Sequence, residues 1–484
     1  MATVNTNDLK IKNAKNLIGS FNRGPIANSY VFVGRVQPWA DENVPTPPQN
    51  NYREFYNTYD NMFALSRIND TDAFHMIPKL KWVSGAVYDR YQHNYTSVNK
   101  SFSGASNLYD SNFVVLNSLN SVYVCLDNDG NTTSTVEPQA AGDDPFYTSD
   151  GYQWLRVYDI TSDNLGTKST NNLMPITSNN VVSTVDGELY TVIIDSPGSG
   201  FTINPIGSSN QVSSYYANID GDGNNAVAKI TITNTAVSKI EVVRNGFGYT
   251  FATLDFVSGE VYESLNDLDL EINGLDPEGN GDLRTTVIIS PPGGWGTDLS
   301  RELGGTKVGV FSSLNYTLFK NHFPSSFRQI GILQDFTYSG AGANPAYLQA
   351  CYAVKVSAPP TGSPYNLGEV ITQVVKSDEG DKLAKGLVVG WDSVSNVLRY
   401  TQSSVNKDTD GQLYRFNGQN NITGNVSCTP DTNYSGTVGD TKFTDGYAQP
   451  ELTKYTGLMT YLTNISPVVR DPNQTERISL VIAF

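Results

Sequence analysis

The chain has 484 residues, which suits roughly two to four domains of ordinary size. Hydrophobic residues make up 38%, aromatic residues 11% and charged residues only 17%, and this composition excludes a wholly disordered chain. The 32 basic and 48 acidic residues give a formal net charge of −16, which disfavours direct binding to nucleic acid or anionic lipid. The sequence lacks a long apolar run and an N-terminal signal-peptide pattern, so we expect a protein that stays in solution in a cytoplasm.

Two segments near the N-terminus have helical periodicity. The first is a weak pattern from Leu9 to Phe21, and the second covers residues 52–66. In the second segment, aromatic and apolar side chains recur at offsets of three and four and are expected on one face of a helix: Tyr52, Phe55, Tyr56, Tyr59, Met62 and Phe63.

Elsewhere apolar and polar residues alternate, as in strands with one wet face. Examples are Ile230 with Ile232, Ile240 with Val242, and the run from Asp267 to Ile272. Clusters of Asn, Asp, Gly, Ser and Pro separate such runs at roughly ten-residue intervals, which is typical of sandwiches and barrels. The sequence therefore predicts a mainly β fold of antiparallel β-sandwich domains with one or two short helices.

An internal repeat lies in the middle of the chain, within a β-rich module that we place at 186–289. Val192–Thr202 and Ile240–Thr250 share a β-rich stem followed by Gly, one residue, Gly, an aromatic residue and Thr. The paired glycines can adopt the positive φ of a tight turn, and the aromatic residues Phe201 and Tyr249 are expected to fold back onto their stems. The glycines are Gly198 and Gly200 in the first copy and Gly246 and Gly248 in the second.

The last eight residues, RISLVIAF, alternate in the manner of a strand that belongs to a sheet, with partners distant in sequence. We therefore predict three domains. The first is a discontinuous β-sandwich made by 1–90 and 305–484, and the second is a β-sandwich made by 91–185 and 290–304. The third is the inserted module at 186–289, with its duplicated GSGFT/GFGYT unit.

Sequence patterns of the common catalytic and metal sites are missing. His75, His93 and His322 are isolated, HExxH and GxSxG do not occur, and neither glycine-rich repeat has the third Gly of a dinucleotide loop. The cysteines, Cys125, Cys351 and Cys428, are too far apart in sequence to suggest a zinc site or a disulfide framework, and we expect them to be reduced. The sequence predicts no catalytic residue, no cofactor and no metal.

Acidic residues leave two weaker alternatives open. A glycosidase pair could be formed by Asp143 with Asp144 or by Asp408 with Asp410, but Asp in turns is the simpler interpretation. DNDGN at 127–131 and DGDGNN at 220–225 imitate the start of a calcium loop. In the first of them the positions where an EF-hand requires Gly and Glu carry Thr132 and Pro138.

Aromatic residues beside Gly and Pro are the remaining distinctive feature. They occur in VGRVQPW (33–39), DGYQW (150–154), PPGGWG (291–296) and VVGWD (388–392). Such residues suit rigid loops that pack on a neighbouring protein, but they can also fill the core of their own domain. Core packing is the favoured interpretation for Trp391, and the two interpretations are balanced for Trp295.

The order of these clusters resembles a known family, the small baseplate wedge subunit of T4-like contractile-tailed phages, the product of gene 8. The matching stretches are FVGRVQPWADEN (32–43), IPKLKW (77–82), VYVCLD (122–127), SDGYQWLRVYDI (149–160), SFRQIGIL (326–333) and the segment 456–484. PPGGWGTDLSRELGG (291–305) resembles a segment of longer, cyanophage-type members. The residues that match the family pattern are Gly34, Arg35, Pro38, Trp39, Asp150, Gly151, Tyr152, Trp154, Trp295, Phe327, Arg328, Gln329, Ile330, Asn464, Pro467, Gln474, Thr475 and Glu476.

The resemblance implies two β-sandwich domains, a homodimer, and a place in the virion as a late structural protein that contacts other baseplate wedge subunits after assembly in the host cytoplasm. It implies no enzyme activity, cofactor, small-molecule substrate, nucleic acid or membrane. Nothing carries over to the module at 186–289 or to the segment 348–450. Two alternatives remain: a receptor-binding or adhesive tail module that uses the inserted repeat, and a polysaccharide-degrading tail protein.

Overall fold

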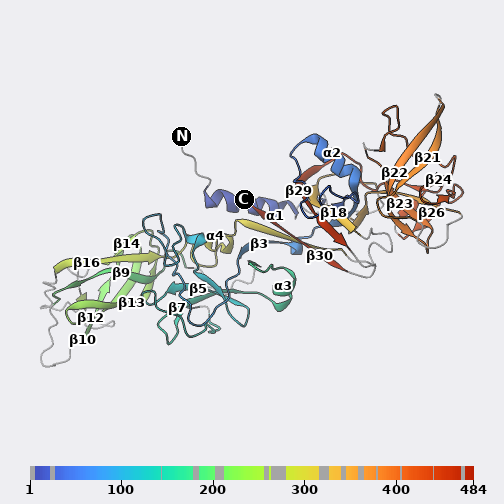
Figure 1. The fold of residues 1–484 in the computed structure, drawn as a ribbon. Helices are drawn as coiled ribbons and strands as arrows, with labels where there is room; N and C mark the ends of the chain where they lie inside the picture. The colour runs from blue at the N-terminus through green and yellow to red at the C-terminus, as the bar shows by residue number, and fades with distance from the viewer. Residues whose placement is uncertain are drawn as a thin grey trace. The chain divides into compact units, whose positions relative to one another are not determined.

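The computed structural model describes residues 6–21, 28–142, 144–177, 185–201, 212–254, 261–262, 280–314, 326–339, 345–357, 365–377, 380–403, 406–439, 441–469 and 475–484. The fold is mainly β, with antiparallel sheets, as the sequence predicts (Figure 1). Residue contacts divide the chain into two compact units. Unit 1 comprises Met1–Ala14, Phe74–Val308 and Ile482–Phe484, and unit 2 comprises Lys15–Ala73 and Gly309–Val481. The three-domain division stays a prediction.

The first part of unit 1 is built on a sheet with the strand order β4-β5-β7-β6. Strand β5 is buried along almost its whole length, and its core neighbours include Leu155 and Trp295. The elements here are β3 (Ala73–Pro78), η3 (Leu108–Asp110), β4 (Val114–Leu116), β5 (Ser121–Asp127), β6 (Phe146–Tyr147), β7 (Gln153–Asp159), α3 (Ser162–Thr167), β8 (Leu173–Pro175) and α4 (Leu299–Glu302). Helix α1 (Asn7–Phe21) begins in this unit, and β8 pairs with β3.

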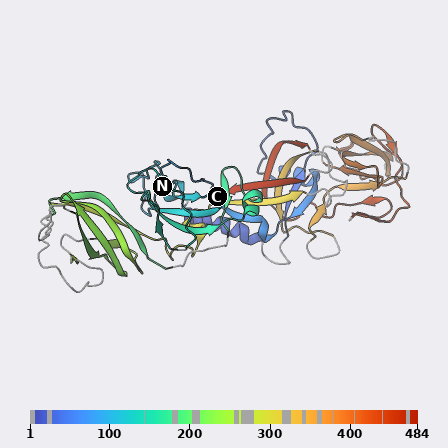
Figure 2. The same cartoon turned by 90° about the horizontal axis from the view of Figure 1, so that it is seen from below.

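The rest of unit 1 is the module with the repeat, whose strands lie side by side in both views (green in Figures 1 and 2). Its elements are β9 (Leu189–Ser199), β10 (Val212–Asn218), β11 (Asp220–Gly221), β12 (Asn224–Thr233), β13 (Ala236–Phe247), β14 (Ala252–Thr253), β15 (Val261–Tyr262) and β16 (Asn280–Ile289). They form sheets in the orders β13-β12-β10-β15, β16-β9 and β11-β14.

The repeat prediction is confirmed. All four glycines have φ between 63° and 79°, which is the left-handed region that favours glycine. Phe201 and Tyr249 are only 1% and 4% exposed and pack in the same core, to which both stems contribute. Ile230 and Ile232 are buried as expected, while the predicted strand at 267–272 lies outside the described residues.

Unit 2 contains a sheet with the order β19-β2-β1-β18-β29, in which β18 is buried at every position. Its elements are β1 (Ser29–Gly34), α2 (Tyr52–Asn61), β2 (Met62–Arg67), η2 (Asp70–Asp72), β18 (Ser326–Gln334), β19 (Tyr347–Gln349) and β29 (Leu458–Val469). The closing strand β30 (Glu476–Ala483) is hydrogen-bonded to β17 (Lys307–Leu314). The prediction that the C-terminal segment joins a sheet with a distant partner is therefore confirmed.

A second sheet of unit 2 has the order β25-β24-β21-β22-β23-β20-β28, and β26 pairs with β27. Trp391 packs edge-on against Tyr365 with ring centres 5.4 Å apart, so it contacts the core of its own sheet, as expected. The strands are β20 (Tyr352–Lys355), β21 (Val370–Ser377), β22 (Gly380–Asp392), β23 (Val397–Thr401), β24 (Ile422–Thr423), β25 (Ser427–Cys428), β26 (Gly436–Val438), β27 (Thr441–Phe443) and β28 (Tyr447–Ala448). The cysteines of both units are free and buried, and burial raises the pKa of Cys351 to about 11.

The predicted helix at 52–66 is wrong in its last third, from residue 62 to residue 66. The Asn51 side chain caps the start of α2, and the helix ends at Asn61. Met62 adopts an extended backbone and pairs with Gly34 of β1, so residues 62–67 form a strand. Pairing with β1 outweighs the helical periodicity here, because it buries Met62 completely. The weak helix predicted from Leu9 to Phe21 is confirmed as α1.

Candidate interface surface

Several residues of the family pattern meet in unit 2, although hundreds of residues separate them in sequence. Arg328 of β18 is 9% exposed and binds both carboxylate oxygens of Glu42, with its Nε 3.0 Å from each and its Nη2 2.8 Å from Oε1. Its Nη1 donates to the Val36 carbonyl oxygen and to Ser326 Oγ, at 3.0 and 3.1 Å. Arg328 thus ties the segment that follows β1 onto a buried strand.

The first motif, at 34–39, forms the turn that leads away from β1. Gly34 lies so close to α2 that a Cβ atom would stand 2.9 Å from the Asn61 carbonyl oxygen, which explains why this position carries glycine. Arg35 has a φ of 62°, and its guanidinium lies over the ring of Trp39, 3.7 Å from the ring centre. Trp39 Nε1 donates to the Ile465 carbonyl oxygen of β29 at 2.9 Å.

A third attachment comes from the polar pair on β18 and β29. Gln329 Nε2 donates to Asn464 Oδ1 at 2.8 Å, and Asn464 Nδ2 donates to the Thr46 carbonyl oxygen at 2.8 Å. We call residues 37–51 the arm. The clamp is the set of residues through which the arm is attached to the sheet: Trp39 and Glu42 of the arm itself, and Arg35, Arg328 and Asn464 outside it.

The arm lies outside helices and sheets, bends at residues 40–44 and is largely exposed, with Val44 70% exposed. Its prolines, Pro38, Pro45, Pro47 and Pro48, restrict the backbone and leave carbonyl groups without a helix or sheet partner of their own. An exposed segment fixed by side chains at three points loses little conformational entropy when another protein binds it. This arrangement favours protein recognition.

The clamp is expected to weaken in acid. The hydrogen bond from Arg328 lowers the pKa of Glu42 from its ordinary value of about 4.3. The stabilisation is therefore complete above the unfolded-state pKa and is lost as the pH falls through the lowered folded-state value. Hydrogen exchange of peptides from the arm, corrected for the intrinsic pH dependence, should show protection at pH 7 that is lost as the pH falls below the ordinary Glu pKa of about 4.3. A Glu42→Gln variant should show weak protection across the same pH range, and an unchanged wild-type profile would contradict the prediction.

Two exposed tyrosines follow the arm directly in sequence, and a third, Tyr455, packs against the second of them. Tyr52, Tyr56 and Tyr455 are 77%, 52% and 50% exposed, and we call them the tyrosine patch. Tyr52 stacks on Tyr56 with ring centres 6.5 Å apart, and Tyr56 meets the ring of Tyr455 edge-on at 5.2 Å. Aromatic side chains at a protein surface are the most frequent binding hot spots, because they bury a large area at a small entropic cost.

The tyrosine patch rests on a buried ion pair. Asp60 and Lys454 are 8% and 9% exposed in their side chains, and Lys454 Nζ lies 3.4 Å from Asp60 Oδ1. The Tyr455 hydroxyl donates to the same carboxylate oxygen at 2.7 Å. Tyr455 also has a φ of 66°, a strained conformation for a residue with a large side chain. The fold therefore holds this ring in a fixed, exposed position.

The second motif, at 150–154, lies in the core of unit 1. The Asp150 carboxylate accepts the backbone N–H groups of Thr135 and Val136 at 2.6 and 2.9 Å. Burial opposes ionisation of Asp150, but these bonds and one from Thr148 outweigh it and lower its pKa. Gly151 lies in the turn before β7, and Tyr152 and Trp154 are fully buried, stacked with ring centres 5.4 Å apart.

The remaining pattern residues are placed as follows. Trp295 is 1% exposed and packs edge-on against Tyr91, with ring centres 4.8 Å apart, so it is a core residue of unit 1. Phe327 and Ile330 are buried in β18. Pro467 is half-buried in β29, Thr475 is exposed, Glu476 is buried at the start of β30, and Gln474 lies outside the described residues.

The acidic alternatives find little geometric support. A hydrogen bond from Lys382 lowers the pKa of Asp410 to about 2, and backbone hydrogen bonds lower the pKa of Asp408, so neither carboxyl suits a general acid. Asp143 lies outside the described residues. Within the described ranges, no group of three His, Cys, Asp or Glu residues is placed to hold a metal ion. No helix in the described part of the chain is long and apolar enough to cross a membrane.

Sequence reasoning missed Glu42, Asp60, Lys454 and Tyr455. Glu42 stands inside the matching stretch 32–43, but nothing in that stretch shows that its partner is Arg328. The ion pair of Asp60 and Lys454 has no sequence signal, because 394 residues separate the two. Comparison with protein-family models gives no match, and comparison with curated proteins finds no similar sequence.

Proposed function

We propose that this chain is a structural subunit of the baseplate wedge of a contractile phage tail. It acts in the virion as a homodimer that binds neighbouring wedge subunits and makes or breaks no covalent bond. The tyrosine patch carries this proposal, and the clamped arm beside it in sequence adds to it. Both features present preorganised, exposed surface on a rigid β framework, which suits binding to another protein.

The physical basis is multivalent association. Each exposed surface supplies a few aromatic or backbone contacts, and closed symmetric assembly makes the later contacts effectively intramolecular. A net charge of −16 keeps free subunits apart and favours partners with basic surfaces. The sequence resemblance on 32–43, 326–333 and 456–484 supports the same proposal, because these segments form the clamp and its surroundings.

A double variant of the tyrosine patch tests the proposal. Tyr52→Ser with Tyr56→Ser should leave the free energy of unfolding within about 0.5 kcal/mol of wild type, because both side chains are largely exposed. The variant should nevertheless fail to complement a phage that lacks the gene, with the protein absent from purified tails. The matched control is Phe102→Ser, a change at another exposed aromatic residue, 59% exposed, which should complement normally.

Two outcomes would contradict the proposal. One is normal incorporation of the double variant into tails, which would remove the tyrosine patch as the interface. The other is an electron-microscopy map of the particle in which this chain lies outside the baseplate, which would remove the function itself.

A further inference from the structure

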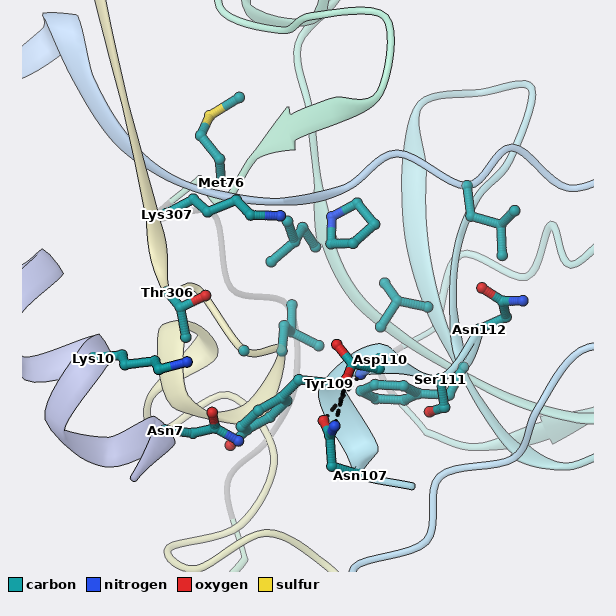
Figure 3. A pocket seen from close by; sticks show the side chains of 17 residues that line it. Asn7, Lys10, Met76, Asn107, Tyr109, Asp110, Ser111, Asn112, Thr306 and Lys307 are labelled. Atoms are coloured by element: carbon teal, nitrogen blue, oxygen red, sulfur yellow. Dashed lines mark hydrogen bonds between the residues drawn. The ribbon is translucent and has the colours of Figure 1, made fainter. Parts of the chain in front are cut away.

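A polar cavity of about 360 Å³ lies within unit 1, away from the tyrosine patch and the arm in sequence. It is formed by the first turn of α1, by β3, by the segment around η3, and by the residues that join α4 to β17 (Figure 3). This volume corresponds to roughly a dozen water molecules, at the lower end of ligand-binding pockets.

Two lysines of this cavity have no acidic partner among the residues that the structure describes. Lys10 of α1 and Lys307 of β17 are both half-buried, and Figure 3 shows their side chains extending into the space that the lining residues enclose. Among the described residues, neither ammonium group forms an ion pair.

The charged residues among the described lining of the cavity are Lys10, Lys307 and Asp110. Asp8 binds Arg301, with Nε 3.2 Å from Oδ1, and Asp110 accepts a hydrogen bond from Asn107. Lys10 also lies in the first turn of a 15-residue helix, where its charge adds to the positive end of the helix dipole. Lys10 and Lys307 together with Asp110 therefore leave one net positive charge in the lining, which an anionic group would neutralise.

The cavity wall is well ordered by contacts within unit 1. The Tyr109 hydroxyl donates to the Arg301 carbonyl oxygen at 2.6 Å. The Tyr109 ring lies against Gly304, where a Cβ atom would stand 2.5 Å from ring carbons. Asn7, Ser111, Asn112 and Thr306 add uncharged polar groups, while Ile77, Phe113 and Leu303 give part of the wall an apolar surface.

We propose that this cavity binds a carboxylate group carried on a partly apolar body. The two ammonium groups would bind the carboxylate oxygens, the amide and hydroxyl groups would donate further hydrogen bonds, and the apolar wall would contact the rest of the ligand. Phosphate is disfavoured, because none of the described lining residues is an arginine that could form a bidentate fork with it. The carboxylate can come from a free small acid or from an acidic segment of a protein, and the experiment distinguishes them.

The test is isothermal titration of the full chain at constant ionic strength. The probes are glutarate and citrate as free acids, an acetylated Glu-Leu-Glu peptide amide as a protein segment, and inorganic phosphate for comparison. At least one carboxylate probe should bind with a Kd below about 1 mM. Lys10→Gln with Lys307→Gln should weaken that binding by about tenfold or more. The control, Lys12→Gln with Lys81→Gln, makes the same charge change at exposed lysines and should stay within about twofold.

The outcomes separate as follows. Binding of a free acid assigns a small-molecule source, and binding of the peptide alone assigns a protein source. The proposal is overturned if no carboxylate probe binds, if phosphate binds more tightly than every carboxylate, or if both double variants lose affinity equally. Lys10→Arg with Lys307→Arg keeps both charges and should keep the binding, and a folded Arg variant that no longer binds would also contradict the proposal.

Discussion

Replacing Tyr152 with Ala is expected to lower the free energy of unfolding of unit 1 by about 3–5 kcal/mol. The side chain is fully buried, stacks on Trp154 and meets the ring of Tyr88 edge-on. Its hydroxyl donates to the Thr132 carbonyl oxygen at 2.6 Å and accepts the Tyr88 N–H at 3.3 Å. Truncation therefore leaves a cavity and an unpaired backbone N–H group on Tyr88, which is only 2% exposed.

Urea unfolding of the full chain, read from the transition that contains unit 1, measures this change. Tyr152→Phe keeps the ring and should cost about 1 kcal/mol through the lost hydrogen bonds. The control is Tyr52→Ala, at a tyrosine that is 77% exposed, with an expected change within about 0.5 kcal/mol. The assignment would be contradicted if the Tyr152→Ala protein were as stable as the Tyr52→Ala protein and lost only its assembly. The second motif would then lie at an interface and not in the core.

Replacing Arg328 with Met is expected to release the arm. Met keeps much of the apolar volume but removes the ion pair with Glu42 and the bonds to the Val36 carbonyl and Ser326. The open population of the arm should then rise by about tenfold or more, and limited proteolysis follows that population when opening is fast. Cleavage after Glu42 by a glutamate-specific protease, followed by mass spectrometry, gives a direct measurement.

The matched control for the arm is Arg301→Met, which removes an ion pair to Asp8 whose side chains are 45% and 64% exposed. That change should leave cleavage after Glu42 at the wild-type rate, because exposed pairs contribute little. Cleavage after Glu369 serves as the internal reference in every sample. An Arg328→Met variant cleaved after Glu42 at the wild-type rate would show that the clamp does not hold the arm.

Much of the local structure follows from short-range pattern alone. Alternation predicted the buried faces at Ile230 and Ile232, and the Gly-x-Gly spacing predicted both turns of the repeat, since backbone conformation there depends on the residue itself. The same local reasoning failed at Met62, where a helical period continues but pairing with β1 ends the helix. A helical period of three to four residues gives no information about a strand partner that is nearly thirty positions away in the sequence.

The sequence by itself determined the mainly β class, the duplicated turns and the C-terminal strand, because each depends on alternation or on glycine at fixed positions. Only the tertiary structure decided what the motif residues do. It buried Tyr152 and Trp295 in cores, and it brought Arg328 to Glu42. It also left Tyr52 and Tyr56 exposed on one side of α2, next to Tyr455. Burial and ion pairing depend on which distant segments meet, and that is a property of the folded chain as a whole.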